Sequence, residues 1–379
     1  MKNILIIGGY GNTGRQIAQL LLDRREDVHV ILAGRDLRKA EQMAADLNCR
    51  AGRDRARGIA LDLSDPNQMD QAFRQADFVV NASSTLMYIR SFMEALLRTQ
   101  KDGMDTQLSS SEKLKVLNEL APQFAAAGLM YIADGGFHPG VPGAMARYGA
   151  SRMDTLEKAD VYSVLKIDWK GLSFSPETMD EFVQEFKDYN PTVFRNGAWV
   201  KSSSWKTYPY DFDPPFGKQH TVPMNLREMD ELPRLIPSLR QTGFFVSGFN
   251  PFTDLVLTPL VVLGVKTLPE RTHRSLARLF RWGLNLSKPP FGVLLVADCA
   301  GKTDGEPASF RISLFHEDAY LVTAAPVAAC IEQYLDGIVW QPGVHCQANI
   351  VDPEPFFKAI ADMGVVVKET SGEAVAVRE

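Results

Sequence analysis

The sequence predicts an α/β protein in which a doubly wound parallel sheet precedes a second α+β domain built on a mostly antiparallel sheet. Three observations support this fold class. Apolar runs alternate with helical patterns over residues 1–133, a glycine-rich stretch joins the first run to the first helix, and the alternation weakens beyond residue 150. A chain of 379 residues suits two or three domains of ~150 residues each. We place the domains at 1–145, 146–340 and 341–379.

The opening stretch ILIIGGYGNTG, residues 4–14, carries the most specific signal. Lys2–Ile7 has the apolar, β-branched character of a strand buried on both faces, and residues 15–22 have the apolar spacing of a helix packed on a sheet. The G-x-G-x-x-G between them allows a tight turn, approach of a pyrophosphate and close helix packing, with helix N–H groups facing the phosphates. The alternative is a purely structural turn. We expect a dinucleotide to contact Gly8, Gly9, Tyr10, Gly11, Asn12, Thr13 and Gly14.

The remaining elements of the first domain continue the alternation. Asp36 is a plausible N-cap for its helix, and Pro66 suits a first helical turn. The expected strands are Val28–Ala33, Ile59–Asp62, Phe78–Ala82 and Leu129–Ala133. The expected helices are Asp36–Leu47, Pro66–Phe73, Leu86–Thr99 and Ser110–Ala127.

The end of the second strand favours NADP over NAD. An NAD site usually has an acidic residue there, about 20 residues past the glycines, to bind the ribose 2′-OH. Here the small Gly34 is followed by Arg35, whose guanidinium can bind a 2′-phosphate in a forked geometry. The alternative is that Arg35 is merely solvated while Asp36 caps the helix.

Ligands of such sheets bind outside the carboxyl ends of the strands. We therefore expect the cofactor to pass the ends of the third and fourth strands, where small side chains let it approach the backbone. The residues expected to line this groove are Asp62, Leu63, Asn81, Ala82 and Ser83.

Composition excludes several classes. The net charge of −5 gives no general case for nucleic acid binding, and the four cysteines form no C-x-x-C pair, so we expect neither a disulfide framework nor a metal site. Since a strand begins at residue 2, we expect no signal peptide and a cytoplasmic location. The apolar stretch 255–265 is too short to span a bilayer. The basic segment after it can lie on a membrane surface, at a subunit interface or over the core; we favour a packed helix.

The second domain shows hairpin signals. Residues 160–168 and 291–315 contain strand patterns, and an Asn-Gly pair at 196–197 marks a hairpin. We also expect helices at Pro176–Lys187 and Ala319–Leu335, and an aromatic loop at Ser204–Pro215. Such a sheet often serves as substrate lid and as dimer interface, so we expect a homodimer.

Together, GGYGNTG, AGRDLRKAE, LDLSD, NASS and GGFHPGVPG resemble the saccharopine dehydrogenase-like (saccharopine reductase-like) family of NAD(P)-binding oxidoreductases. The resemblance is strong over residues 1–145 and looser beyond. It implies a Rossmann domain, an inserted α+β domain over the active cleft, and a C-terminal segment, 341–379, that packs back on the first domain. It also implies hydride transfer at an imine or amine carbon, with the cofactor supplying the hydride. The basic cluster that binds diacid substrates in some members is not apparent, and His138 occurs where they carry other residues.

Three residues are candidates for catalysis. His138 lies in a loop of glycines and prolines after the last strand, where a nicotinamide ring would arrive, and an imidazole can exchange protons near neutral pH. Its alternative role is to hold the loop through hydrogen bonds. Tyr88 can donate a proton or pack in the core, and Asp105 falls where the family has a strand end at the cleft. Lys206, His220 and Glu228 are weaker candidates.

We therefore expect an NADP-dependent oxidoreductase acting at a C=N or C–N bond of a small amino or keto compound. No Tyr-x-x-x-Lys stands where carbonyl reduction of the short-chain dehydrogenase kind requires it. One alternative is a reductase of an enoyl or lipid-like substrate at a membrane surface. Another is a non-enzymatic NADP(H)-binding sensor or scaffold.

Overall fold

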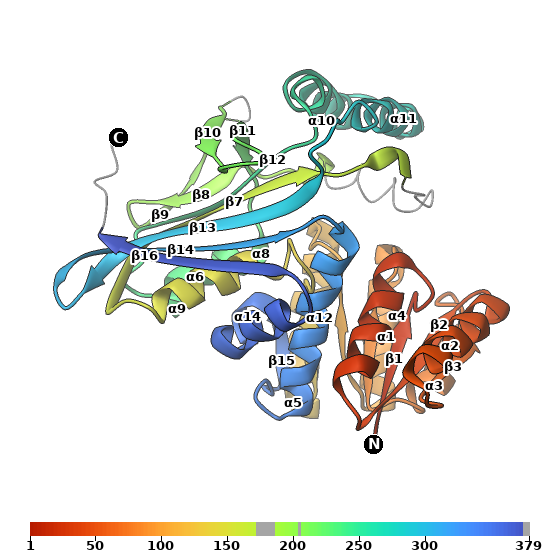
Figure 1. Cartoon of the computed structure of the whole chain (residues 1–379). Coiled ribbons are helices and arrows are strands. Elements are labelled where there is room, and N and C mark those ends of the chain that lie inside the picture. Colours follow the sequence, from red (N-terminus) through yellow and green to blue (C-terminus); the bar gives the residue numbers. More distant parts are fainter. Residues whose placement is uncertain (172–185, 204–205, 374–379) are drawn as a thin grey trace. The chain divides into compact units, whose positions relative to one another are not determined.

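The computed structural model describes residues 1–171, 186–203 and 206–373 (Figure 1). Contacts divide the chain into two compact units. Unit 1 comprises Met1–Val141 and Tyr320–Met363, and unit 2 comprises Pro142–Ala319 and Gly364–Glu379. The chain thus leaves unit 1 after the loop that contains His138 and returns to it at Tyr320, so α12 belongs with the first unit rather than with the second.

Unit 1 contains a parallel seven-stranded sheet in the order β15-β6-β5-β4-β1-β2-β3. Its strand order reverses at β1, between β2 and β4, which makes this a doubly wound sheet with a topological switch point. The strands are β1 (Lys2–Ile7), β2 (Val28–Gly34), β3 (Ala56–Ala60), β4 (Phe78–Asn81), β5 (Asp102–Asp105), β6 (Met130–Ala133) and β15 (Gly343–Cys346).

Helices cover both faces of this sheet. On one face, α3, α4 and α5 bury residues such as Phe73, Phe92 and Phe124 against side chains of the strands. On the other, α1 and α12 are joined by an ion pair between Arg24 and Glu332 (2.7 Å). The helices of unit 1 are α1 (Asn12–Arg24), α2 (Leu37–Ala51), α3 (Pro66–Phe73), η1 (Leu86–Tyr88), α4 (Ile89–Thr99), α5 (Ser111–Ala127), α12 (Ala319–Leu335), α13 (Gln347–Ile350) and α14 (Pro353–Asp362).

Unit 2 contains a nine-stranded sheet that is antiparallel except for one parallel pair, β12 with β7. Its main path runs β10-β11-β12-β7-β13-β14-β16, and β8 and β9 extend from β12. The strands are β7 (Thr155–Lys166), β8 (Thr192–Arg195), β9 (Ala198–Lys201), β10 (Tyr208–Asp211), β11 (Lys218–Pro223), β12 (Gln241–Ser247), β13 (Gly292–Thr303), β14 (Glu306–His316) and β16 (Val366–Glu373). The predicted α/β fold class with a second, mostly antiparallel domain is confirmed.

Most of the helices described in unit 2 fall into two groups. The first, α6 (Pro142–Ala150), α8 (Arg227–Asp230) and α9 (Leu232–Leu235), packs beside the sheet, where Gly149 of α6 approaches Cys299 of β13. The second comprises η3 (Thr253–Leu257), α10 (Thr258–Thr267), η4 (Glu270–Thr272) and α11 (His273–Leu284), while η2 (Trp169–Gly171) follows β7. None of the helices in the described ranges is both long enough and apolar enough to cross a membrane.

Three expectations differ from the structure or fall outside it. The third strand lies at Ala56–Ala60 rather than Ile59–Asp62, because Ala56 through Ala60 pair with Val30 through Gly34 and leave Asp62 in the following loop. The stretch expected to be an aromatic loop contains β10, whose Tyr210 stacks on Tyr162 of β7. Most of the helix expected at Pro176–Lys187 lies outside the described residues.

Candidate cofactor groove and active-site loop

The sequence-predicted cofactor residues gather at the carboxyl edge of the seven-stranded sheet. Parallel pairing aligns the ends of the strands, so that Ile7 of β1 lies beside Ala33 of β2 on one side and Asn81 of β4 on the other. The loops that follow these strands therefore share one edge. It is the edge that contains the switch point, where doubly wound sheets bind their ligands.

The glycine turn after β1 has no room for side chains. Gly8 has a φ of +74°, and a Cβ on it would lie 2.8 Å from the carbonyl oxygen of Ala82. A Cβ on Gly14 would lie 2.3 Å from the carbonyl oxygen of Gly8, so helix α1 can approach the turn only because position 14 is glycine. Gly11 is the N-cap of α1 and makes no side-chain capping bond. The first N–H groups of the helix are thus available to a phosphate, and this bare cradle fits the pyrophosphate of a dinucleotide.

Arg35 lies just after β2, at the position where a 2′-phosphate of NADP would be bound. Its neighbour Gly34 packs directly against the ring of Tyr10, since a Cβ there would lie 2.5 Å from Tyr10 Cε1. The carboxylate of Asp36 caps α2 by accepting from the N–H of Lys39 at 3.2 Å. The carboxylate of Asp36 is therefore occupied in capping α2. The charged side chain at the end of β2 that can meet the nucleotide is Arg35.

Asp62 faces the same corner. Its Oδ1 accepts from the N–H and the hydroxyl of Ser64 at 2.9 and 2.8 Å. The hydrogen bond from the Ser64 backbone is the main reason that the pKa of Asp62 is lowered, and the charge of Arg35 adds to it. Leu63, by contrast, is buried in the core cluster of the sheet, so only its backbone can meet a ligand.

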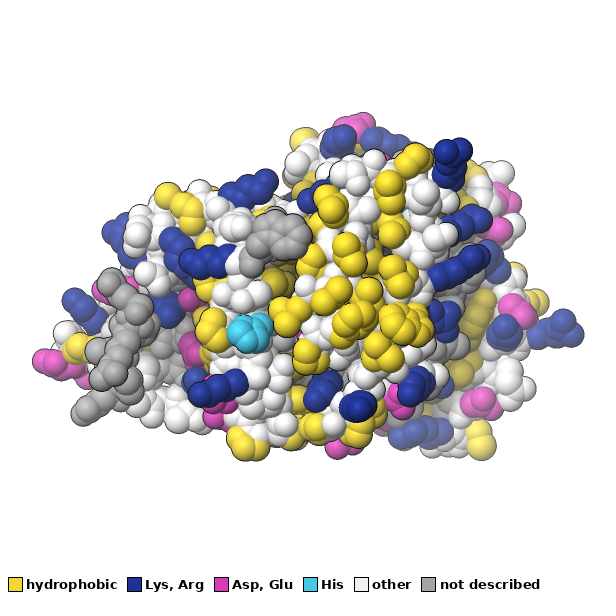
Figure 2. Space-filling model, turned by 90° about the horizontal axis from the view of Figure 1, so that it is seen from above, with side chains coloured by type: hydrophobic (Ala, Val, Ile, Leu, Met, Phe, Trp, Pro, Cys, Tyr) yellow, Lys and Arg dark blue, Asp and Glu magenta, His cyan; other side chains and the backbone are white. Residues whose placement is uncertain are grey.

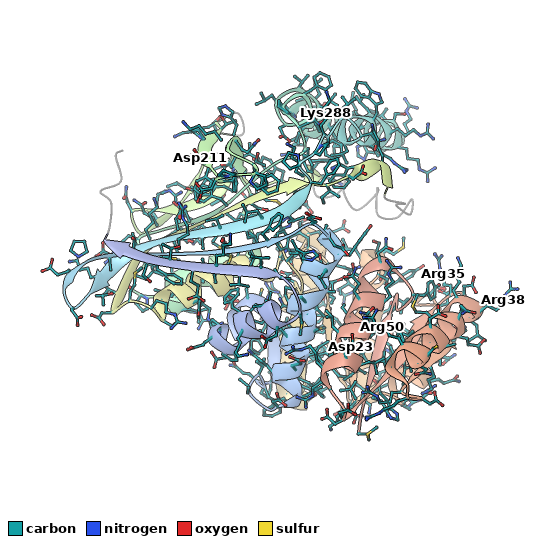
Figure 3. All side chains as sticks on the ribbon, in the orientation of Figure 1. Asp23, Arg35, Arg38, Arg50, Asp211 and Lys288 are labelled. Atoms are coloured by element: carbon teal, nitrogen blue, oxygen red, sulfur yellow. The ribbon has the colours of Figure 1, made fainter. Side chains whose placement is uncertain are left out.

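The arginines of residues 50–57 lie elsewhere. Arg50 at the end of α2 pairs with Asp23 at 3.8 Å, and the buried Arg55 donates to the carbonyl oxygen of Leu22 at 2.7 Å. Figure 3 shows Arg50 with Asp23, apart from Arg35 and Arg38. These contacts are at the amino ends of the strands, so we assign this segment no part in the cofactor groove.

The loop after β4 is held by its own hydrogen bonds. Asn81 is fully buried, and its Oδ1 accepts from the hydroxyl of Ser83 at 2.7 Å. The carbonyl oxygen of Ser83 accepts from Gln107 Nε2 at 2.9 Å. Together with Ala82, which contacts the glycine turn, this loop presents a fixed backbone beside the cradle.

A buried charge cluster underlies the neighbouring strand ends. Lys113 of α5 is fully buried, and its Nζ lies 2.7 Å from Oδ1 of Asp105 and 2.7 Å from Oδ1 of Asp134. Burial opposes the charge on Lys113, but attraction to the two carboxylates outweighs it and raises the lysine pKa. The hydroxyl of Tyr131 donates to Asp105, and that of Ser109 to Asp134 at 2.6 Å. The cluster fixes the chain immediately after β5 and β6.

His138 lies on the loop that this cluster supports. The loop is fastened from the C-terminal segment: Gln347 Nε2 donates to the carbonyl oxygens of Gly136 and Gly140, both at 3.1 Å. The ring of Phe137 packs 4.7 Å from that of His138 between centroids. Burial lowers the pKa of His138 to about 4, although part of its surface stays accessible. The expectation that it titrates near neutral pH is thus corrected: at pH 7 its imidazole is neutral.

Comparisons with known proteins agree with this geometry. Residues 4–132 match the family model described as "Saccharopine dehydrogenase NADP binding domain". Residues 4–132 therefore form an NADP-binding domain of the saccharopine dehydrogenase type. The protein is an NAD(P)-dependent oxidoreductase, and its cofactor is NADP.

Similarity to curated proteins extends well beyond this domain, over three quarters of the chain or more. A carboxyaminopropylagmatine dehydrogenase of Synechocystis is 22% identical over 96% of both chains. A carboxynorspermidine synthase of Vibrio cholerae is 26% identical over 76% of both. Among solved structures, saccharopine dehydrogenase (L-Glu forming) from Saccharomyces cerevisiae is similar with a TM-score of 0.65 at 17% identity, covering 98% of this chain and 100% of that one. This likeness shows the shared fold.

The other residues that the sequence offered as candidates for catalysis pack against or hydrogen-bond to neighbouring parts of the protein. Tyr88 is half-buried and packs against the core cluster of unit 1. Asp105 has no exposed surface, so we expect it to position its neighbours and not to touch substrate. In unit 2, Glu228 is buried and accepts from the N–H of Gly143 at 2.8 Å, while Lys206 lies over the ring of Tyr208.

Lys113 and Gln347 were missed by sequence reasoning. In SSEKLKVL, Lys113 differs in no obvious way from the exposed Lys115 two positions on. Heptad-like spacing with Val116, Leu117 and Leu120 places it on the buried side of α5, which was a usable signal. Gln347 had no local signal, because its partners lie more than 200 residues earlier in the chain. Asp134, which follows β6, accepts from Lys113 and Ser109.

Proposed function

We propose that this protein catalyses NADP-dependent hydride transfer at the C=N or C–N bond of a small amino or keto compound. The observation that carries the proposal is similarity over 96% of the chain to a dehydrogenase named for carboxyaminopropylagmatine, supported by carboxynorspermidine synthase. Both names denote amines that bear a carboxyl group. The proposed reactants are accordingly a carbonyl compound and an amine, at least one of them carrying a carboxylate.

The residues of unit 1 suit this chemistry. NADPH, when bound, supplies a hydride to the imine carbon, and the imine nitrogen gains a proton, so that the products are a secondary amine and NADP⁺. The glycine turn and Arg35 hold the nucleotide, and the rigid backbone at Asn81–Ser83 borders the groove. Because hydride transfer requires a fixed donor–acceptor geometry, rigidity at this edge favours reaction.

His138 is our proposed contact to the substrate nitrogen. A neutral imidazole can accept a proton from the amine in the oxidative direction, and its N–H can direct a hydrogen bond in the reductive direction. Asp105 and Asp134 act through Lys113 by holding the strand ends, and Gln347 holds the loop itself. Tyr88 is a weaker candidate because its ring packs on the core.

The test is a two-substrate screen. Purified full-length protein is mixed with NADPH, a panel of aldehydes and keto acids, and a panel of amino acids, diamines and polyamines, while NADPH absorbance is followed. We expect NADPH consumption only when a carbonyl and an amine are both present, with a secondary amine identified by mass spectrometry. If NADPH is consumed with a carbonyl compound alone as fast as with the amine present, the proposal is overturned.

A second candidate is reduction of an activated alkene or lipid-like substrate. The observation that favours it is the exposed apolar side of α10 and α11, described below. Enones and unsaturated acyl compounds therefore belong in the same screen. Turnover of these without any amine would replace the first proposal by the second.

A further inference from the structure

The helical segment η3–α10–α11 of unit 2 exposes an unusual number of large hydrophobic side chains. Leu255 is 54% exposed, Leu260 and Leu263 are each 53% exposed, and Trp282 is 52% exposed. We call the following set the apolar face: Phe252, Leu255, Val256, Leu260, Leu263, Leu268, Leu279, Trp282 and Leu286. Figure 2 looks onto this side of the molecule and shows hydrophobic side chains gathered there. An exposed patch of this kind marks an interaction site.

Folding of the segment does not account for this face. The inner sides of α10 and α11 already form a core cluster that includes Val261, Val265, Phe280 and Leu284. Helix α10, with the sequence TPLVVLGVKT, is therefore apolar on its outer side as well as on its inner side. A helix that is hydrophobic all round is normally buried, so the outer side of α10 lacks a covering partner within the described residues.

Cations surround the apolar face. Residues 252–288 contain six basic residues and two acidic ones, Asp254 and Glu270, a formal charge of +4 in a chain whose net charge is −5. We call the following set the basic rim: Lys266, Arg271, Arg274, Arg278, Arg281 and Lys288, all exposed. Of the two acidic residues, Asp254 is half-buried and accepts hydrogen bonds from backbone N–H groups at Gly248 to Asn250, so it does little to offset the rim.

The apolar face and the basic rim are arranged like the two sides of a helical segment that lies at a membrane interface. Trp282 packs edge to face on Phe252 with ring centroids 6.1 Å apart, which joins α11 to the start of η3 across the apolar face. Arg274, Arg278 and Arg281 recur at helical spacing along α11 beside the stripe of Leu279 and Trp282. Amphipathic segments that lie in the plane of a bilayer combine apolar side chains of this type, Trp included, with Lys and Arg on the flanks.

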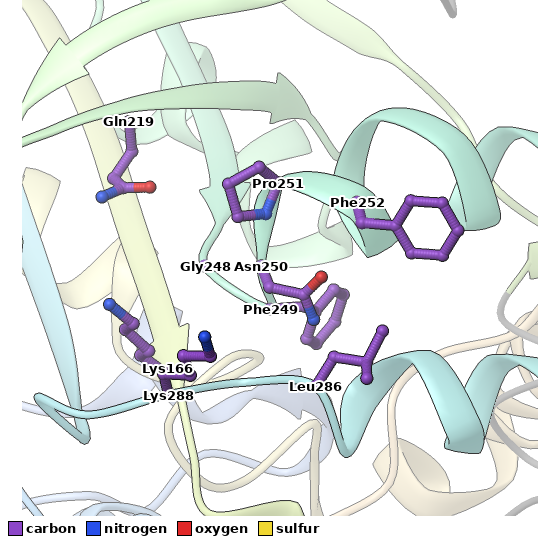
Figure 4. A pocket seen from close by; sticks show the side chains of 9 residues that line it. All are labelled: Lys166, Gln219, Gly248, Phe249, Asn250, Pro251, Phe252, Leu286 and Lys288. Atoms are coloured by element: carbon purple, nitrogen blue, oxygen red, sulfur yellow. The ribbon is translucent and has the colours of Figure 1, made fainter.

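A pocket of about 460 Å³ adjoins the apolar face. Phe252 and Leu286 belong both to that face and to the pocket wall, while Lys166, Lys288 and Gln219 supply its polar groups. Figure 4 shows Lys166 and Lys288 among the side chains that line this pocket. Two ammonium groups beside an apolar wall suit a phosphate headgroup whose acyl chains extend toward the apolar face.

We propose that the apolar face and the basic rim dock this protein on the surface of an anionic phospholipid bilayer. The apolar side chains enter the interfacial region, and the rim meets the phosphate groups. A second copy of the chain fits less well, because a symmetric dimer through this face would oppose two +4 segments. The inference is independent of the reaction proposed for unit 1.

The test is co-sedimentation of the full-length protein with vesicles. Binding should be at least about tenfold tighter to vesicles containing phosphatidylglycerol than to pure phosphatidylcholine, and should weaken with added salt, since each cation near an anionic surface contributes. R274E/R278E should reduce binding at least about tenfold, whereas R234E, on the exposed face of α9, should not. Equal binding to both vesicle types, or to neither, would overturn the proposal.

The apolar contribution is tested separately. Leu260→Ser with Leu263→Ser, and Trp282→Ser alone, should each weaken vesicle binding severalfold. The matched control is Trp340→Ser, because Trp340 of unit 1 is 55% exposed and remote in sequence from this segment. Retained NADPH binding and an unchanged thermal midpoint show that each variant is folded. A concentration-dependent dimer that L260S/L263S abolishes, without vesicle binding by the wild type, would assign the face to a second copy and overturn the proposal.

Discussion

The ammonium nitrogen of Lys113 lies 2.7 Å from Oδ1 of Asp134, although neither side chain is more than 1% exposed. A second buried carboxylate, that of Asp105, lies at the same distance from it. Removing one charge from such a cluster leaves an opposite charge buried without a counter-ion. The resulting loss of folding free energy exceeds what the ion pair itself contributes to stability. The cluster thus has two effects: it contributes to the stability of the fold, and it fixes the loops that begin at the carboxyl ends of β5 and β6.

Lys113→Met should destabilise the protein by about 3–5 kcal/mol, because two carboxylates would lose their buried cation. Lys115→Met, an exposed position on the same helix, is the matched control and should change stability by less than about 0.5 kcal/mol. Urea denaturation measures both. Adding Asp134→Asn to Lys113→Met should recover part of the loss; equal stability of the two lysine variants would show that the cluster is not charged as described.

His138 should make stability depend on pH. Its pKa is about 4 in the folded protein and ~6.5 in the unfolded chain, so between these values only the unfolded state binds the proton. Stability from this group is complete above about pH 6.5 and is lost as the pH falls toward 4, by at most about 3 kcal/mol because the ring keeps some contact with solvent. The difference in unfolding free energy between wild type and His138→Gln should shrink over this range. A constant difference would contradict the lowered pKa.

His138→Gln also tests the proposed contact with the substrate. If the ring meets the substrate nitrogen, kcat should fall by about 10²-fold or more while NADPH binding is retained. A loop-holding role alone would instead change KM and stability together.

Gly14→Ala should weaken NADPH binding by at least about tenfold, ~1.4 kcal/mol. The new Cβ would lie 2.3 Å from the carbonyl oxygen of Gly8, and α1 would have to move away from the phosphates. Gly372→Ala in β16 is the control, since its Cβ would lie 3.6 Å from Ser309 Oγ, an ordinary contact. Fluorescence titration with NADPH gives the affinities, and an unchanged affinity in Gly14→Ala would contradict the assigned cradle.

Arg35→Ala should remove the preference for NADPH over NADH, lowering affinity for NADPH by about tenfold or more and leaving that for NADH nearly unchanged. Arg50→Ala removes the same charge from the far end of α2, where Arg50 pairs with Asp23, and should preserve the preference. If both variants discriminate like the wild type, another group binds the 2′-phosphate.

Local patterns predicted much of unit 1 and one hairpin of unit 2. The Asp36 cap forms as expected, with the N–H of Lys39 as its donor, and the hairpin at Asn196-Gly197 joins β8 to β9. These features depend on interactions within a few residues, which a sequence displays directly. The third strand was predicted at the wrong residues because pairing with β2 sets its register and its ends. Ile59 and Ala60 belong to both the predicted and the observed strand, so the local apolar pattern did not distinguish the two.

The sequence by itself determined the glycine turn, the cation at the end of β2 and the alternation of strands and helices through most of residues 1–133, because each is encoded in short-range chemistry and period. Only the tertiary structure decided that Lys113 is a buried counter-ion, that Gln347 fastens the His138 loop from 209 positions away, and that the described residues leave one apolar side of α10 exposed. The reason is physical. A side chain's charge state and role depend on which distant groups exclude water from it, and that is fixed only when the chain is folded.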